Sequence, residues 1–339
     1  MHNKFVKIQS EMLNELLKSV RLKHPATPKE VTTLSDLYLK KHSELFNIWQ
    51  SEGLLSAYLN YFFTLNWLRL KFVIQQGLND QFFDGLTDVV EFGSGPGTFH
   101  LAAVEASLPI ANFNFIEIAE PAKTCHHEFA EQLQLMRTPL KWSHQAPTNI
   151  APHALAVFSY SLNEISDLPA WVDKCEALLI AEPATQTQAR ALQKLRDQLI
   201  ERGWHVWAPC THQQKCPLLQ HSERDWCHAR LHISPPKEFV ELEKHLPMKN
   251  ETVTVSYLLA RKDRPNPRAN HKARLIGDTL FERGKVRQAL CRGSQREFAS
   301  WLTRNGEPEL LENGARVLLP ENVETRGNEI RLPLTLIKD

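Results

Sequence analysis

The sequence predicts an α/β protein built around a doubly wound, mostly parallel β-sheet. From Asp88 onward, short apolar segments that suit buried strands alternate with amphipathic segments that suit helices, which is the pattern of a parallel sheet covered by helices. A glycine-rich turn lies directly between the first of these strands and the helix that follows it. The chain has 339 residues, of which 42% are apolar and 23% charged, so it is long enough for a large core and has an ordinary globular composition.

The glycine-rich turn is the segment around which the rest of the chain is organised. Residues 88–100 read DVVEFGSGPGTFH, in which an apolar strand is followed by an acid and then by three glycines that alternate with a serine and a proline. Glycine permits torsions that other residues avoid, so the turn can bring a ligand close to its peptide groups and to the next helix N-terminus. The candidate cofactor-binding residues of the turn are Glu91, Gly93, Ser94, Gly95 and Gly97.

The glycine spacing distinguishes between kinds of nucleotide-binding loop. A dinucleotide-binding loop reads G-x-G-x-x-G, whereas this one reads Glu-x-Gly-x-Gly-x-Gly. The tighter spacing looks like motif one of the S-adenosylmethionine-dependent methyltransferases, where the turn passes under the amino-acid part of the cofactor. The alternative is an ordinary tight connection, which a short motif alone does not exclude.

Residues 1–80 form a predicted N-terminal helical region. Apolar residues recur at helical spacing in residues 35–50 and again in residues 54–76. Their aromatic side chains are most simply core residues. A helical region of this kind commonly covers a cofactor cleft or meets a partner, and both roles stay open.

Further polar positions follow predicted strands. Residues 112–118 suit a strand, and Glu117 lies near its end, about twenty residues past the loop, where an acid can accept both ribose hydroxyls of a nucleoside. A surface acid at a strand end is the alternative. Residues 154–161 form another buried strand, which leads directly into Asn163 and Glu164. Because ligands of such sheets bind beyond the carboxyl ends of strands, these two residues are the candidate catalytic residues facing the transferable methyl group.

Strands are also predicted at residues 177–181 and 204–208, with an amphipathic helix over residues 186–202 between them. We assign residues 81–260 to one methyltransferase-like domain. Its regular pattern is interrupted by a cysteine-rich insertion at residues 209–250.

The cysteine-rich insertion has little apolar sequence to form a core, so a metal or cluster would hold it together. Four thiolates suit either a tetrahedral zinc ion or a 4Fe–4S cluster. The spacing matches neither the paired C-x-x-C of common zinc sites nor the runs of ferredoxins, so free cysteines in a loop, or a zinc site that includes one histidine, are the alternatives. The candidate metal ligands are Cys210, Cys216 and Cys227, with Cys291 as the fourth.

The last part of the chain, residues 261–339, is predicted as a basic C-terminal region with short strands. Although the net charge is +1, residues 261–304 contain twelve Lys or Arg against four Asp or Glu. Such a segment suggests a polyanionic partner, and a solvated surface is the alternative. The candidate RNA-binding residues are Arg261, Lys262, Arg264, Arg268, Lys272 and Arg274.

Several classes of protein are excluded at this stage. No apolar run approaches the length needed to cross a membrane, and the first residues carry charges at helical spacing in place of an apolar signal core. We therefore expect a cytoplasmic protein with no membrane partner. We also expect a monomer.

Several phrases of the sequence agree on one family: EFGSGPGTFH, SYSLNEI, IAEPAT, the run APC…KCPL…DWCH, then VSYLLARK, ARLIGDTLFERGKV and LCRGS. Together they resemble the methyltransferase-like family of mitochondrial small-ribosomal-subunit assembly proteins and their bacterial relatives, over roughly residues 35–300. One departure is Ala184, which stands where the family often has glycine after the EP of its fifth strand.

The resemblance implies a Rossmann-like, seven-stranded methyltransferase fold, S-adenosylmethionine as cofactor, and a cysteine insertion that in the mitochondrial relatives looks like a 4Fe–4S site. It also implies association with the small ribosomal subunit and its rRNA. Three functions follow as hypotheses: an rRNA methyltransferase, a non-catalytic iron–sulfur assembly factor that binds rRNA, and a small-molecule methyltransferase.

Overall fold

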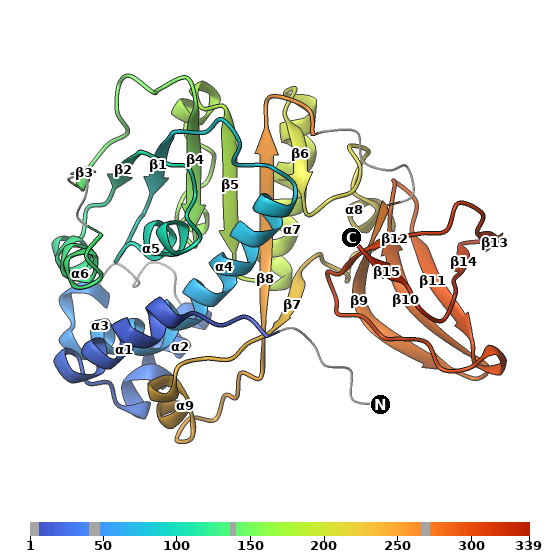
Figure 1. Ribbon diagram of the computed structural model, residues 1–339, viewed down its shortest axis with the longest axis horizontal. Helices are drawn as coiled ribbons and strands as arrows, with labels where there is room; N and C mark the ends of the chain where they lie inside the picture. Colours follow the sequence, from blue (N-terminus) through green and yellow to red (C-terminus); the bar gives the residue numbers. More distant parts are fainter. Residues whose placement is uncertain (1–6, 41–47, 136–139, 266–271) are drawn as a thin grey trace.

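The computed structural model describes residues 7–40, 48–135, 140–265 and 272–339. Its strands form two sheets, and these sheets lie side by side as the centres of two bodies (Figure 1). The larger body contains the N-terminal helices and the methyltransferase-like domain, and the smaller body contains the C-terminal strands.

The larger sheet has the order β3-β2-β1-β4-β5-β8-β6. Strands β1 to β5 are parallel, and β8 runs antiparallel to both β5 and β6. The predicted seven-stranded sheet is therefore confirmed. Its strands are β1 (Asp88–Phe92), β2 (Asn112–Ile116), β3 (Lys141–Ser143), β4 (Ala154–Ser159), β5 (Ala177–Glu182), β6 (His205–Ala208) and β8 (Thr252–Arg261).

The strand order reverses at β1, which pairs with β2 on one side and with β4 on the other. Such a reversal leaves a crevice beyond the carboxyl ends of the strands. The predicted strand at residues 112–118 ends earlier, at Ile116, so Glu117 lies in the connection just after β2. The helices that follow the strands are α5 (Thr98–Glu105), α6 (Glu120–Gln132) and α7 (Gln186–Glu201).

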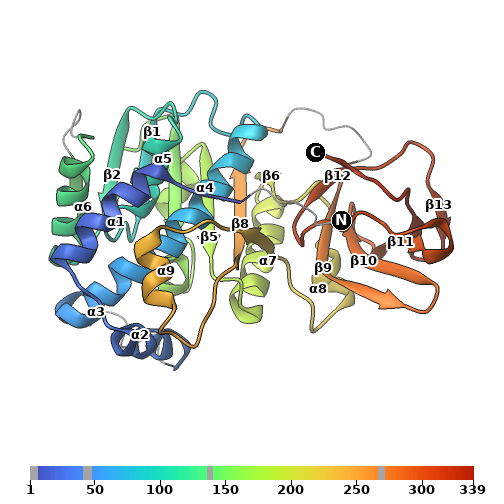
Figure 2. The ribbon, with the colours of Figure 1, turned by 60° about the horizontal axis from the view of Figure 1, so that its bottom comes forward.

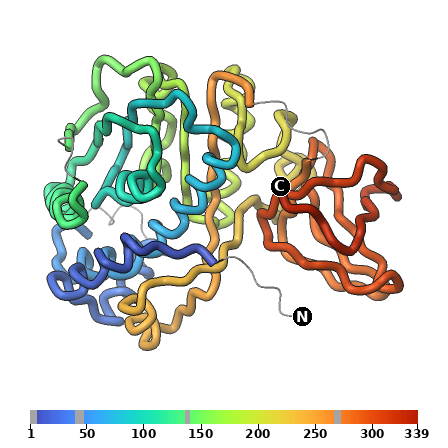
Figure 3. Tube along the Cα trace, viewed as in Figure 1, coloured from blue at the N-terminus to red at the C-terminus, as the bar shows by residue number. Residues whose placement is uncertain are grey.

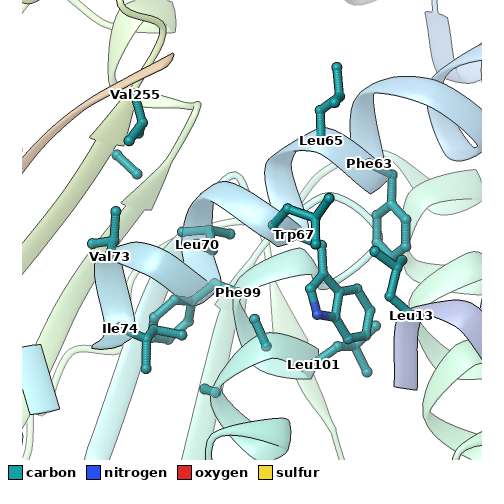
Figure 4. Close-up of a cluster of buried hydrophobic side chains, with 14 of the residues drawn as sticks. Leu13, Phe63, Leu65, Trp67, Leu70, Val73, Ile74, Phe99, Leu101 and Val255 are labelled. Carbon is teal, nitrogen blue, oxygen red and sulfur yellow. The ribbon is translucent and has the colours of Figure 1, made fainter. Parts of the chain in front are cut away.

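The N-terminal helices lie with α9 (Lys237–Glu243) at one end of the larger sheet (Figure 2). They are α1 (Glu11–Lys23), α2 (Pro28–Lys40), α3 (Glu52–Ala57), the π-helical turn η2 (Tyr58–Phe62) and α4 (Phe63–Asn79). Helix α4 is apolar on most sides and buries Phe63, Trp67, Leu70, Val73 and Ile74 (Figure 4). This core fixes α4 against the larger body.

Besides α9, the cysteine-rich insertion contains two further elements. Helix α8 (Pro217–His221) follows Cys216, and strand β7 (Ala229–His232) follows Cys227 and pairs with the beginning of β8. Strand β7 is therefore an addition to the larger sheet that the sequence did not predict.

The smaller sheet has the order β13-β14-β11-β10-β9-β12-β15. Its own core includes Leu275, Leu290, Trp301, Val317 and Ile330. Figure 3 shows that the chain ends between the two bodies. The strands are β9 (Lys272–Glu282), β10 (Lys285–Cys291), β11 (Glu297–Leu302), β12 (Arg316–Leu318), β13 (Glu324–Arg326), β14 (Glu329–Arg331) and β15 (Ile337–Lys338).

A buried ion pair joins the two bodies. The Arg316 guanidinium of β12 lies 2.5 Å from the carboxylate of Asp80, which follows α4, and both side chains are largely buried. Within the part of the chain that the structure describes, no helix is both long and apolar enough to span a bilayer.

Candidate functional site

The glycine-rich loop connects β1 to α5, and each of its three glycines has a left-handed torsion that disfavours residues with a side chain. The φ angles of Gly93, Gly95 and Gly97 are 61°, 53° and 79°. A Cβ on Gly93 would lie 2.7 Å from Ser161, and one on Gly97 would lie 2.1 Å from the His126 ring. A Cβ on Gly95 would meet only Trp49, at 3.8 Å, so this glycine faces open space. The loop therefore packs against protein at two glycines and faces a cavity at the third.

Glu117 is held beside this loop by backbone donors. Its Oε2 atom accepts a hydrogen bond of 2.8 Å from the Gly95 N–H, and its Oε1 atom accepts bonds of 2.8 Å from Ile118 and Ala119. The fixed carboxylate lines the cavity in front of the loop. This position suits the predicted contact with ribose hydroxyls.

Glu91 lies on β1 directly before the loop and is fully buried. Neither carboxyl oxygen has a hydrogen-bond partner among the described residues. Burial raises the pKa of Glu91 well above its ordinary value, and the charge of Glu117 raises it further. A buried carboxyl group without a partner is costly, and a cationic group placed beside it would remove that cost. This arrangement fits the ammonium group of an S-adenosylmethionine amino-acid end.

The cavity in front of the loop has a volume of about 960 Å³. Its floor includes Gly93, Ser94 and Gly95, and its cover comes from the N-terminal helices. Such a volume is large enough for a nucleoside cofactor together with an acceptor group. Of the two roles left open for the N-terminal region, covering a cofactor cleft is the one that this arrangement favours. The covering side chains include Tyr38, Tyr58, Phe62, Asn66 and Arg69.

The predicted catalytic residues line the same cavity after the end of β4. The buried Oδ1 atom of Asn163 has no hydrogen-bond partner among the described residues. Burial raises the pKa of Glu164 to about 7, with a contribution from the charge of Glu117. Tyr160, just before them, has a left-handed φ of 60°, which costs energy in a residue with a side chain and is a feature of functional sites.

Glu182 is a further buried acid that the sequence analysis did not single out, and it directly precedes Pro183 and Ala184, which line the cavity. It ends β5, is buried, and accepts a hydrogen bond of 3.0 Å from the Leu162 N–H. Burial raises its pKa to about 8. The signal that could have found it is its place at the carboxyl end of the strand beside β4. Asn163 and Glu164 thus provide hydrogen-bond acceptors in the cavity for a nitrogen that carries hydrogen.

The four predicted metal ligands meet at a second cavity, of about 40 Å³. Cys210, Cys216 and Cys227 reach it from the insertion, and Cys291 reaches it from the end of β10 in the smaller body. Burial raises the pKa of Cys227 to about 11, and both burial and the neighbouring Cys210 raise the pKa of Cys291. The structure therefore brings together four thiols that are far apart in the sequence.

Hydrogen-bond donors surround these sulfur atoms. Arg274 donates to Cys227 Sγ at 2.6 Å, and Gln193 donates to Cys216 Sγ at 3.2 Å. Arg274 is buried and has no carboxylate partner among the described residues, so a negative charge on the sulfur atoms would compensate it. A second buried guanidinium, from Arg196, interacts with Cys210.

The chemistry of this donor set fits a group held by four thiolates. However, no three His, Cys, Asp or Glu side chains within the described ranges are grouped so that they could hold a metal ion. The expected zinc or iron–sulfur site is not shown by this geometry, and it stays a prediction.

The structure corrects two of the predicted RNA contacts. Arg261 is 5% exposed and pairs with Glu176 and Asp263, and it also donates to the Phe82 carbonyl at 2.7 Å. Arg274 is 2% exposed and bonds to the cysteine site. The prediction that these two arginines contact phosphates is therefore wrong, because their side chains are inside the protein.

The other predicted RNA contacts have different surroundings. Lys272 is mostly buried and pairs with Asp339 at 2.5 Å, whereas Lys262 and Arg264 are exposed. Arg268 lies outside the described residues. Much of the positive charge of this segment is paired within the protein, as for Lys285 with Glu329, Arg287 with Glu282, Arg292 with Glu297 and Arg296 with Asp225.

Comparison with solved structures finds distant similarity to methyltransferases. The chain is similar to magnesium protoporphyrin IX methyltransferase from Synechocystis PCC 6803 with bound SAM, with 11% identity and a TM-score of 0.38 over 69% of this chain and 97% of that one. It is similar to the tRNA methyltransferase TrmK of B. subtilis, with 10% identity and a TM-score of 0.33 over 56% and 65% of the two chains. Similarity at this level carries no information on activity or substrate.

Sequence comparison identifies the family. No curated protein matches the sequence. The sequence profile of the family described as mitochondrial small ribosomal subunit Rsm22 matches residues 78–314, which is well over half of the chain and includes the glycine-rich loop and all four clustered cysteines. The chain belongs to the Rsm22 family.

Proposed function

We propose that the protein is an S-adenosylmethionine-dependent, methyltransferase-like protein that acts on the small ribosomal subunit, or assists its assembly, through its rRNA. The observation that carries the cofactor assignment is the cavity at the carboxyl ends of β1, β2 and β4, where Glu117 is fixed beside Gly95. Glu91, which is buried directly before the loop and has no hydrogen-bond partner among the described residues, supports it. The ribosomal assignment is supported by membership of the Rsm22 family.

The residues of the cavity have separate tasks in this proposal. The cofactor supplies an activated methyl group, and the protein binds and orients. Glu117 accepts the ribose hydroxyls, and Glu91, buried directly before the loop, compensates the charge of the ammonium group. Asn163 Oδ1 accepts a hydrogen bond from the target nitrogen, and Glu164, with a pKa of about 7, takes up the proton that this nitrogen loses.

Contacts with rRNA would come from exposed cations near the end of β8. Lys262 and Arg264 are exposed and remain candidates, and Arg268 remains one from the sequence. Phosphate contacts of this kind give an affinity that falls as salt rises. Since much of the basic segment is paired internally, we expect a shallower salt dependence than its charge suggests.

A second candidate function is a non-catalytic assembly factor that contains a metal cofactor, and the cysteine cavity favours it. A 4Fe–4S cluster, or alternatively zinc, bound by Cys210, Cys216, Cys227 and Cys291 would join the insertion to the smaller body. Buried Arg196 and Arg274 would compensate the negative charge of the thiolates.

Complementation of cells that lack the protein distinguishes these functions. An arginine at Gly95 would extend into the cofactor cavity. Gly203 serves as the control position, because it also has a positive φ and a Cβ there would meet nothing within 4 Å. If cofactor binding is required, Gly95→Arg fails to restore assembly of small subunits and Gly203→Arg succeeds. If only the metal site is required, Gly95→Arg restores assembly and Cys216→Ser fails.

Sedimentation in sucrose gradients tests the ribosomal assignment itself. We expect the wild-type protein to migrate with small subunits or their precursors at low salt. Migration only as free protein, combined with binding of S-adenosylmethionine, would contradict the assignment and favour a small-molecule methyltransferase.

A further inference from the structure

Arg69 is a cation in the cofactor cavity that neither the sequence motifs nor the proposed mechanism uses. It lies on α4 and lines the cavity together with Gly93, Ser94 and Gly95. Its Nη1 atom donates a hydrogen bond of 2.9 Å to Asn66 Oδ1, and its guanidinium carbon lies 6.0 Å from the centre of the Tyr160 ring.

The guanidinium of Arg69 has unused hydrogen-bonding capacity. Among the described residues, its buried Nε atom has no hydrogen-bond partner and no acidic side chain pairs with the guanidinium. A guanidinium carries five donors in a planar fork that matches a carboxylate, and an uncompensated charge next to a protected cavity is costly. The cavity therefore has a place for an anionic group beside Arg69.

The position of Arg69 relative to the loop identifies this group. The Tyr58 hydroxyl interacts with Asn66, the partner of Arg69, and with Thr98, the first residue of α5 after the glycine-rich loop. Arg69 thus lines the cavity together with the loop residues Gly93, Ser94 and Gly95, and the amino-acid part of the cofactor binds beside this loop in methyltransferases of this motif type. The α-carboxylate is the anionic group of S-adenosylmethionine.

We propose that Arg69 binds the α-carboxylate of S-adenosylmethionine, while Asn66 and Tyr160 hold its guanidinium in place. This inference rests on the proposed cofactor. It makes α4 part of the cofactor site and gives the N-terminal helical region a direct binding role. Helix α4 is a rigid support for such a contact, because Trp67 and Leu70, on either side of Arg69 in the sequence, are fully buried (Figure 4).

The test compares two ligands that differ only in the carboxylate. Binding of S-adenosylmethionine and of decarboxylated S-adenosylmethionine to the full chain is measured by isothermal titration calorimetry. We expect Arg69→Gln to weaken binding of S-adenosylmethionine by about 10- to 100-fold, the range for a charge-assisted hydrogen-bonded pair. Binding of the decarboxylated ligand should change less than about twofold. Arg202→Gln, which removes a surface arginine paired with Asp173, is the control and should change neither affinity.

Two further measurements keep the test decisive. Arg69→Lys retains the charge without the planar fork, and we expect it to recover part of the lost affinity. Thermal unfolding of each variant without ligand checks that the fold is intact. An equal loss for both ligands in Arg69→Gln would overturn the inference while leaving the proposed cofactor standing. Failure of the wild-type protein to bind either ligand would overturn the proposed cofactor and this inference with it.

Discussion

Replacing Gly97 by alanine tests how the glycine-rich loop is held in place. The residue has a φ of 79°, so any side chain is strained there, and the new Cβ would lie 2.1 Å from the ring of His126. That ring cannot move away easily. It is fully buried, its Nε2 atom lies 2.9 Å from His100 Nδ1, and it packs against the rings of Phe115 and Trp142.

The expected loss of stability has two parts. A left-handed torsion costs an alanine about 1–2 kcal/mol. Overpacking of a buried site adds about 1–3 kcal/mol. Gly203→Ala isolates the first part, because Gly203 has a φ of 87° and a Cβ there would meet nothing within 4 Å. We therefore expect the free energy of unfolding to fall by about 1–2 kcal/mol in Gly203→Ala and by about 2–5 kcal/mol in Gly97→Ala.

Urea unfolding followed by tryptophan fluorescence measures both losses. Adding His126→Ala to the Gly97→Ala variant should make the two changes non-additive, because the smaller residue vacates the space that the new Cβ needs. Equal destabilisation by Gly97→Ala and Gly203→Ala would refute the reasoning, since it would mean that the contact with His126 does not constrain the loop.

Three other predictions follow from buried charges. Burial raises the pKa of Glu182 from about 4.5 to about 8, so its protonated form stabilises the fold below pH 4.5 and this contribution is lost as pH rises to 8. Glu182→Gln should therefore have a higher melting temperature than the wild type at pH 9 but not at pH 5. An equal gain at both pH values would contradict this prediction. If Glu164 accepts the proton, the rate of methyl transfer should rise with pH up to about 7 and then level off. Glu164→Gln should abolish this pH dependence. A rate that still rises with pH in Glu164→Gln would exclude Glu164 as the proton acceptor. Anaerobically purified Arg274→Met should contain less iron or zinc than the wild type. Arg296→Met, which breaks the pair with Asp225, is the control. Unchanged metal content in Arg274→Met would show that Arg274 does not stabilise the thiolates.

Local patterns in the sequence were sufficient for five strands of the larger sheet, β1, β2, β4, β5 and β6, but not for β3 and β8. Apolar runs identified the strands around the glycine-rich loop, and the loop itself identified the carboxyl edge of the sheet where Glu117, Asn163 and Glu164 now lie around one cavity. The strand order adds what periodicity does not contain, namely that β8 inserts antiparallel between β5 and β6. Strand β7 was missed because it is short and lies within a segment with weak signals.

Long-range pairing explains the remaining differences. A run of basic residues does not reveal that Arg261 is buried against Glu176, which is distant in the sequence. Arg69 was missed for a related reason, since nothing in a helical segment before the loop indicates that one of its side chains reaches the cavity. The cysteines were grouped from the sequence as one candidate ligand set, although their spacing matched no common metal motif, and the family resemblance supported the same set.

Binding of S-adenosylhomocysteine, measured by calorimetry, tests the cofactor assignment most directly. We expect one saturable site per chain in the wild-type protein and in Gly203→Arg, and no binding in Gly95→Arg, whose side chain would extend into the cavity. Absence of saturable binding to the wild-type protein, or undiminished binding to Gly95→Arg, would contradict the account.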